Sequence, residues 1–139
     1  MRILHVVHQF PPETRGGLEG YVHDLAAAQK NAGHEVFVIS GSMEPRSEVG
    51  CESDPAGEFT VERIHRSDLY FDSWDKGYCP EVGLVLRDRL EELRPDVLHL
   101  HHWIRLTSDI EPGPGTGHTR GPDPSRPCDQ LSPGFPRGF

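Results

Sequence analysis

The sequence predicts an α/β fold built on a mainly parallel sheet, and three observations lead to this prediction. Short apolar runs at residues 3–7 and 36–39 are typical of strands buried on both faces of a parallel sheet. Segments with apolar residues at helical spacing alternate with such runs. The expected order is β-α-β-β-α-β, and this alternation indicates parallel strands joined by crossover connections.

The first helix is expected over residues 18–32. Its apolar residues have helical spacing, which gives the helix one stripe to bury. These residues are Leu18, Tyr21, Val22, Leu25 and Ala32. Gly33 follows directly, and a glycine there tolerates the left-handed conformation that ends many helices.

The later elements are expected from alternation, spacing and one proline. Residues 59–64 alternate and predict a third strand, placed toward an edge of the sheet. Residues 82–93 predict a second helix, which ends before Pro95 because the residue preceding a proline avoids the helical region. Residues 97–100 predict the last strand. Residues 41–57 are polar and contain several turn formers, so a loop is expected there.

Composition limits the classes of protein that fit. A chain of 139 residues suits one domain, and its formal net charge of −8 argues against nucleic-acid binding, which uses a basic face. No apolar run is long enough for a transmembrane helix, and the first run is too short and polar for a signal peptide. Cys51, Cys79 and Cys128 lie far apart, which favours reduced thiols in a cytoplasmic protein.

The chain changes character near Ile110. Residues 111–139 hold 7 of the 13 prolines and 6 of the 15 glycines. Three acids and three arginines balance there, so the net charge of −8 lies entirely in residues 1–110. Neither a strand period nor a helix period is present. We therefore expect residues 111–139 to be a disordered tail rich in proline and glycine.

The loop before the first helix is a candidate phosphate or substrate loop. Gly16 and Gly17 let backbone N–H groups approach a ligand, and the helix dipole favours an anion at this end. Arg15 adds a positive charge. The loop matches neither the dinucleotide fingerprint nor a P-loop. Taken alone, a simple tight turn is the favoured interpretation.

Four histidines follow the ends of two predicted strands, and three roles are open to them. They are His8, His99, His101 and His102. Because the carboxyl ends of parallel strands share an edge, these side chains are expected near one another. Imidazoles bind zinc, but no carboxylate or cysteine completes a familiar spacing. Local hydrogen bonding is therefore favoured over a metal site, and contact with a polar ligand lies between the two.

Taken together, several short segments resemble one family. In order and spacing they are similar to the N-terminal domain of family 4 glycosyltransferases of the GT-B fold. The resemblance covers residues 1–110. The segments are Pro11-Pro12, Gly16-Gly17-Leu18-Glu19, Tyr21, Leu25-Ala26, Gly33-His34-Glu35-Val36 and the run from Arg94 to His102.

The resemblance implies a fold, a reaction and a set of partners. Such enzymes have two facing Rossmann-like domains, of which the N-terminal one binds the acceptor. They move a sugar from a nucleotide-sugar to a carbohydrate or lipid-linked acceptor, usually with retention, and require neither a metal nor a cofactor. Peripheral membrane association is compatible with the family, and nucleic acid is not a partner. Gly16 and Gly17 would be the loop glycines, and the four histidines would lie near the cleft without an assigned catalytic step.

The resemblance stops near residue 110, where the family continues with another helix and strand and then the donor domain. We hypothesise that residues 111–139 arise from a frameshift near codon 110, which resequencing the gene would test. We expect no transferase activity from this chain alone. Two alternatives remain open: a free-standing Rossmann-like module that binds a phosphorylated ligand, and a decayed gene product without function.

Overall fold

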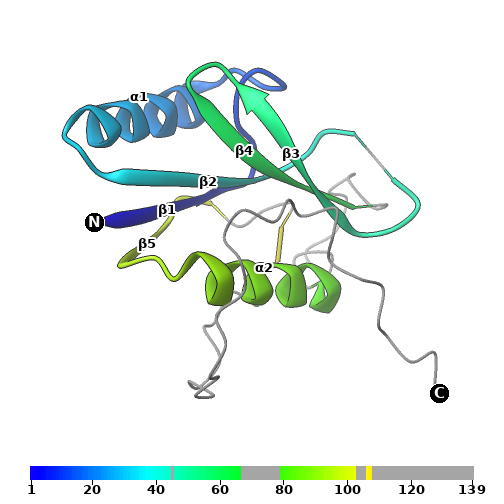
Figure 1. Ribbon diagram of the computed structural model, residues 1–139. Helices are drawn as coiled ribbons and strands as arrows, with labels where there is room; N and C mark the ends of the chain where they lie inside the picture. Colours follow the sequence, from blue (N-terminus) through cyan, green and yellow to red (C-terminus); the bar gives the residue numbers. More distant parts are fainter. Residues whose placement is uncertain (45, 67–78, 103–105, 108–139) are drawn as a thin grey trace.

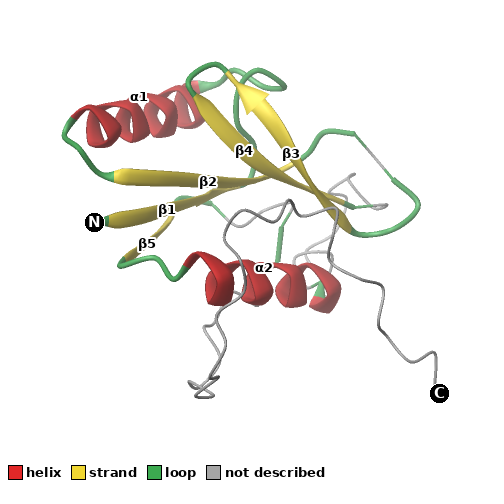
Figure 2. Ribbon diagram, in the orientation of Figure 1, coloured by secondary structure: helices red, strands yellow, loops and turns green. Residues whose placement is uncertain are grey.

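The computed structural model describes residues 1–44, 46–66, 79–102 and 106–107. In chain order its elements are β1 (Arg2–Val7), α1 (Gly17–Asn31), β2 (Glu35–Gly41), β3 (Gly50–Ala56), β4 (Phe59–His65), α2 (Pro80–Leu93) and β5 (Val97–Leu100). The strands form a single sheet, with α1 over one face and α2 under the other (Figure 1). Coloured by secondary structure, the described part is a three-layer α/β fold (Figure 2). The predicted fold class is confirmed.

The sheet is mainly parallel, as the sequence predicts. Its strand order is β3-β4-β2-β1-β5. Strand β1 runs parallel to β2 and β5, and β2 runs parallel to β4. Residues 3–7 of the central strand β1 are all buried, which explains why that strand is a continuous apolar run with one histidine in it.

One expectation about the sheet is wrong. Residues 41–57 are not a loop throughout, because Gly50–Ala56 forms β3, antiparallel to β4. Strand β4 is therefore the second strand from this edge of the sheet and not the edge strand itself. Strand β3 is polar because it is the edge strand, and it contains Pro55, which a central strand would not tolerate. The polar residues of β3 form ion pairs with β4, such as Asp54 with Arg63. These pairs characterise the sequence of β3 more than apolar alternation does.

Each face of the sheet has its own apolar core. On one face, β-strand valines pack against Val22 and Ala26 of α1. On the other face, Leu4, Ile39 and Ile64 form a core with the buried apolar residues of α2. The helices thus cover the sheet through the apolar stripes that their spacing predicts.

Both helices end close to the expected residues. Helix α1 ends in a Schellman motif, in which the Gly33 N–H donates to Lys30 O and the His34 N–H donates to Gln29 O. Gly33 has φ +88°, so the expected role of this glycine is confirmed. Helix α2 ends at Leu93, and Arg94 adopts the left-handed conformation just before Pro95.

Several expectations fall on residues that the structure does not describe. The tail at residues 111–139 and Cys128 lie outside the described residues. Of the helices that are described, α1 has 15 residues and α2 has 14, and neither could cross a membrane.

Candidate functional site

The strand order reverses at β1, so the carboxyl end of β1 is the topological switch point of the sheet. From β1 the chain passes through α1 to β2 on one side, whereas β5 joins β1 on the other side. Open α/β sheets bind ligands where the strand order reverses in this way. His8 directly follows β1, and His102 lies two residues beyond β5. These two histidines therefore come to this edge from the two strands that flank the reversal.

His8 and His102 meet beside the first turn of α1. Their ring centroids are 4.9 Å apart. His8 Nε2 also lies 3.2 Å from Glu19 Oε1, and both side chains are largely buried. The three residues, which we call the edge cluster, come from the β1 loop, the β5 loop and helix α1. The cluster joins a carboxylate to two imidazoles, and such groups can accept or donate hydrogen bonds to hydroxyl groups.

The two glycines of the loop differ in their surroundings. Gly16 is the N-cap of α1, and no side chain caps the helix there. A Cβ on Gly16 would collide with Glu19 Oε2, whereas a Cβ on Gly17 would meet nothing within 4 Å. Gly16 is thus needed for the close approach of Glu19, and Gly17 leaves open space at the helix N-terminus. The backbone N–H groups and the helix dipole make this end suitable for an anion.

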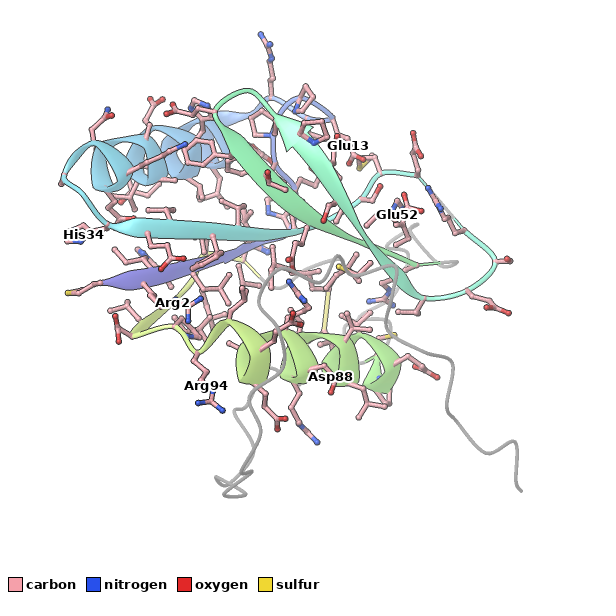
Figure 3. The ribbon with its side chains drawn as sticks, viewed as in Figure 1. Arg2, Glu13, His34, Glu52, Asp88 and Arg94 are labelled. Carbon is pink, nitrogen blue, oxygen red and sulfur yellow. The ribbon has the colours of Figure 1, made fainter. Side chains whose placement is uncertain are left out.

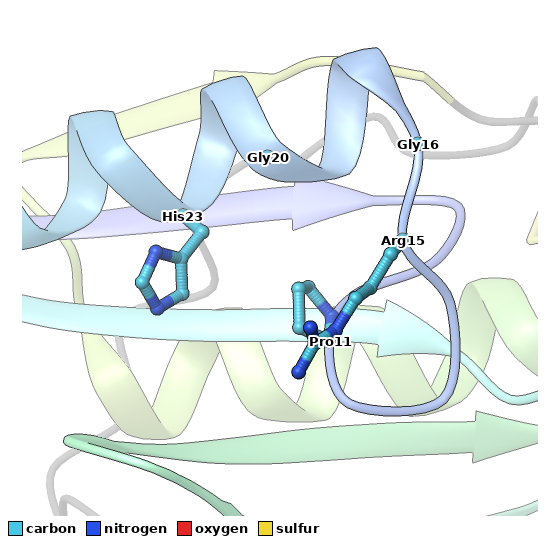
Figure 4. Close-up of a pocket in the computed structure, with 5 residues that line it drawn as sticks. All are labelled: Pro11, Arg15, Gly16, Gly20 and His23. Atoms are coloured by element: carbon cyan, nitrogen blue, oxygen red, sulfur yellow. The ribbon is translucent and has the colours of Figure 1, made fainter.

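Arg15 lies in a hollow beside the same helix end. The hollow is lined by Pro11, Arg15, Gly16, Gly20 and His23 (Figure 4). Gly17 is not among these lining residues. The expected loop residues therefore divide between two surfaces, with Arg15 in the hollow and Gly16 between the hollow and the edge cluster. A guanidinium in this position adds positive charge next to the helix N-terminus.

Arg63 fixes the loop that carries these groups. Its guanidinium is buried and donates to Phe10 O at 3.1 Å and to Pro11 O at 2.9 Å. It also pairs with Asp54 and lies 3.7 Å from Glu13. The loop after β1 is thereby held against β4. Sequence reasoning missed Arg63, although a charged residue at an inward position of an alternating strand is a usable signal.

Glu13 secures the same loop on its other side. Its carboxylate accepts hydrogen bonds from Ser42 Oγ at 2.8 Å and from the Met43 N–H at 2.9 Å. These bonds join the β1 loop to the residues that follow β2. The loop before α1 is thus held from two neighbouring strands, which is the kind of support that a preorganised binding loop requires.

His99 and His101 belong to a different group from His8 and His102. They lie with His5 on the face of the sheet that α1 covers, and we call these three the histidine triad. His5 is the register partner of His99 on the neighbouring strand. The rings of His5 and His101 stack at 5.1 Å, and those of His99 and His101 are 4.1 Å apart. Sequence reasoning did not include His5 among the candidate site residues, although a polar residue within a buried apolar strand is a usable signal.

Hydrogen bonds define the protonation pattern of the triad. Gln29 Oε1 lies 2.6 Å from His5 Nε2 and can only accept, so this nitrogen carries the proton. His5 Nδ1 then accepts from His101 Nε2, 2.8 Å away. Burial, together with the nearby His99 and His5, lowers the pKa of His101 to about 4. Burial also lowers the pKa of His5. At neutral pH these two imidazoles are therefore uncharged.

Comparison with known proteins identifies the family. The model of Glycosyltransferase Family 4 matches residues 15–113 of this chain. The chain belongs to glycosyltransferase family 4. The match begins in the glycine loop and extends beyond β5, so it includes both helices and strands β2 to β5 of the described fold, and β1 precedes it.

Two further comparisons agree with the family. Glycogen synthases from two strains of Mycobacterium tuberculosis, CDC 1551 and H37Rv, are each 34% identical to the chain. Each alignment covers 75% of this chain and 28% of the glycogen synthase. The catalytic domain of starch synthase IV from Arabidopsis thaliana, bound to ADP and acarbose, superposes with a TM-score of 0.52 at 18% identity. That match covers 78% of this chain and 29% of the starch synthase chain and shows a shared fold.

The family 4 chain therefore spans less than a third of the length of these relatives. The resemblance to the GT-B N-terminal domain is confirmed in family and in fold. The described residues supply one sheet with its glycine loop, its edge cluster and its histidine triad.

Proposed function

We propose that this chain is the acceptor-side domain of a glycosyltransferase that moves a sugar from a nucleotide-sugar to a carbohydrate acceptor. The observation that carries the proposal is the edge cluster beside an uncapped helix N-terminus, at the strand-order reversal of a family 4 fold. In this position a phosphate can approach the helix end while sugar hydroxyls approach the cluster.

The two halves of the site suit the two halves of such a reaction. The backbone N–H groups at Gly17, with Arg15 nearby, favour the negative charge of a donor diphosphate. Glu19 is buried and pairs with the largely buried His8, so the two groups are held in one orientation in which they could hydrogen-bond a sugar hydroxyl. We propose transfer with retention at the anomeric carbon and without a required metal, on the basis of the family alone.

We propose that the 139 residues alone are inactive. This is supported by the coverage, because the chain aligns with less than a third of each relative, and by the family resemblance, which implies that a second domain binds the donor. We further propose that residues 1–110 form the domain and that residues 111–139 are a separate, out-of-frame tail. A cytoplasmic location is also proposed, supported by Cys51 and Cys79, whose thiols are buried and not joined in a disulfide.

Ligand titration followed by NMR tests the proposal. The purified chain is titrated with ADP and, separately, with maltoheptaose, because one structural relative was solved with ADP and acarbose. We expect ADP to shift the amide signals of Gly16 and Gly17, and the sugar to shift those next to His8 and Glu19. Glu19→Gln should weaken sugar binding, and His34→Ala, in the turn before β2, should leave it unchanged.

Three results would count against the proposal. Inorganic phosphate that binds as tightly as ADP, with no response to sugar, would favour the free-standing phospholigand module. Absence of both responses from a folded chain would favour a decayed gene product. Sugar transfer from any nucleotide-sugar by the purified 139-residue chain would contradict its proposed inactivity.

A further inference from the structure

We propose that His5, His99 and His101 form a binding site for a divalent transition-metal ion, with Zn²⁺ as the best fit. The site is separate from the edge cluster and independent of sugar transfer. It departs from the sequence-based expectation for His99 and His101, in which local hydrogen bonding is favoured over a metal site. One ligand nitrogen from each residue can be chosen so that all three lie within 4.8 Å of one another.

The backbone brings the three imidazoles together without a flexible loop. His5 and His99 are register partners on adjacent parallel strands, so their side chains leave the sheet on the same face. His101 lies two residues beyond His99, and its N–H donates to Val6 O at 3.0 Å, which continues the pairing of β5 with β1. All three imidazoles therefore lie on one face of the sheet within a small area. A sheet is a favourable base for a metal site, because it holds the ligands in place.

Gln29 gives the triad the outer support that metal-binding histidines commonly have. Its Oε1 accepts the Nε2–H of His5, which leaves Nδ1 of His5 unprotonated and directed at His101. A hydrogen bond of this kind on the far nitrogen fixes the tautomer and ring orientation of a ligand histidine. Gln29 comes from α1, so the helix positions a ligand that the sheet carries.

The geometry needs only side-chain adjustment to hold the ion. Zinc–nitrogen bonds of about 2.0–2.1 Å place neighbouring nitrogens of a tetrahedral site roughly 3.3 Å apart. His5 Nδ1 and His101 Nε2 are 2.8 Å apart, so they must separate slightly while the third nitrogen approaches. Rotation of the partly exposed His99 and His101 rings achieves this, and the fourth position remains open to water.

The chemistry of the donors selects the ion. Three imidazoles suit zinc, copper and nickel, whereas magnesium and calcium require oxygen ligands. The ion takes the lone pair of His5 Nδ1, and His101 changes tautomer: its proton leaves Nε2 and one returns to Nδ1 through solvent, so that Nε2 becomes a ligand. Both imidazoles stay neutral, and no net proton is released.

Binding would join β5 to β1 by a cross-link within the sheet. Strand β5 has four residues, and within the described part of the chain it is the outer strand on its side. Its Leu100 is half exposed. A metal shared between the two strands stabilises the folded chain in proportion to its occupancy.

Titration with Zn²⁺ alone tests the proposal on the full-length chain. We expect saturable binding with one ion per chain by calorimetry, a raised melting temperature, and a visible d–d absorption spectrum when Co²⁺ is used. His99→Ala and His101→Ala should abolish these responses. Gln29→Leu should lower the affinity by about 10- to 100-fold, since it removes the partner of a ligand and not a ligand. Circular dichroism confirms that each variant is folded.

His34→Ala and His8→Ala are the matched controls, because both remove an imidazole outside the triad. Both should bind Zn²⁺ like the unmodified chain. Absence of saturable binding by the unmodified chain would overturn the proposal. Equal binding by His99→Ala and the unmodified chain would also overturn it and would point to other thiols or histidines. None of these readouts depends on sugar or nucleotide, so failure here is distinguishable from failure of the proposed transferase role.

Discussion

The two faces of the sheet bury different kinds of side chain. Under α2 the contact is mostly apolar, with Leu86 at 1% exposure. Its charged member, Arg89, is paired with Glu62 and Glu92 and so joins the helix to β4. Under and beside α1, the sheet buries His5 and Arg63. The α2 face is therefore mainly an apolar core. The α1 face also buries polar groups that position a loop or could bind a ligand.

This contrast is consistent with the position of the proposed site. Figure 3 shows Glu13 near the end of the sheet that carries the β1 loop, and Asp88 on α2 with Arg94 just after that helix, below the sheet. Polar groups buried inside a fold need partners, and those on the α1 face find them in loop carbonyls and in α1 itself. The predictions that follow test whether the two faces are separable in stability and in binding.

The largest expected effect comes from Arg63→Met on the α1 face. The change leaves Asp54 without its buried partner and removes the hydrogen bonds to Phe10 O and Pro11 O. Breaking a buried pair from one side costs about 3–5 kcal/mol, and the loop that bears the site should lose its position as well. Urea unfolding and the ADP titration measure the two effects.

Arg46→Met is the control for Arg63→Met. Arg46 pairs with Glu52, and both side chains are 45% exposed, so the loss should stay below about 1 kcal/mol with binding retained. If Arg63→Met leaves ADP binding intact in a chain that still folds, then Arg63 supports the sheet only. In case Arg63→Met does not fold, Asp54→Asn provides a milder test of the same pair.

A smaller effect is expected on the other face from Leu86→Ala. This side chain is buried against β-strand residues, and its truncation should cost roughly 3 kcal/mol. Leu84→Ala on the same helix should cost well under half of that, since Leu84 is 37% exposed. Affinity for ADP and for Zn²⁺ should be unchanged in both, measured under conditions where the chain is folded. A marked loss of either affinity would show that the faces are not separable.

How much of this could be predicted from the sequence depends on how local each signal is. Strand β5 and the Gly33 helix stop were predicted because spacing, proline and glycine act within a few residues. Strand β3 was missed because a polar edge strand with a proline resembles a loop until its partner is known. The sequence therefore predicts where strands lie along the chain, but it does not predict which strands pair.

The candidate site residues were likewise predictable only where their signal was local in the sequence. His8 and His102 were candidates because each follows a predicted strand, yet the pairing of His8 with Glu19 depends on where α1 begins. His5 joined His99 only through the register of β1 with β5, and these residues are 94 positions apart. Arg63 bonds to carbonyls more than 50 residues away, so no local pattern could assign it a partner.

A more modest loss of stability is expected on acidification of the chain in the presence of a chelator. Burial lowers the pKa of His101 to about 4, whereas an unfolded histidine titrates near ~6.5. The unfolded state thus binds a proton first as the pH falls, so the stabilisation is complete above ~6.5 and is lost as the pH falls toward 4. His101→Gln should flatten this part of the curve of unfolding free energy against pH. An unchanged slope would mean that the imidazole is solvated in the folded chain.

The smallest effects on stability, and the finest test of the α1 face, come from the two loop glycines. Gly16→Ala places a Cβ against Glu19 Oε2, so the carboxylate has to move away from His8. Gly17→Ala meets open space. Each should change the free energy of unfolding by no more than about 1 kcal/mol, because a flexible side chain can yield. Gly16→Ala should weaken the binding of maltoheptaose in the NMR titration while Gly17→Ala leaves it intact. The reverse order would mean that the sugar approaches the backbone at Gly17 and that Glu19 serves only the helix dipole.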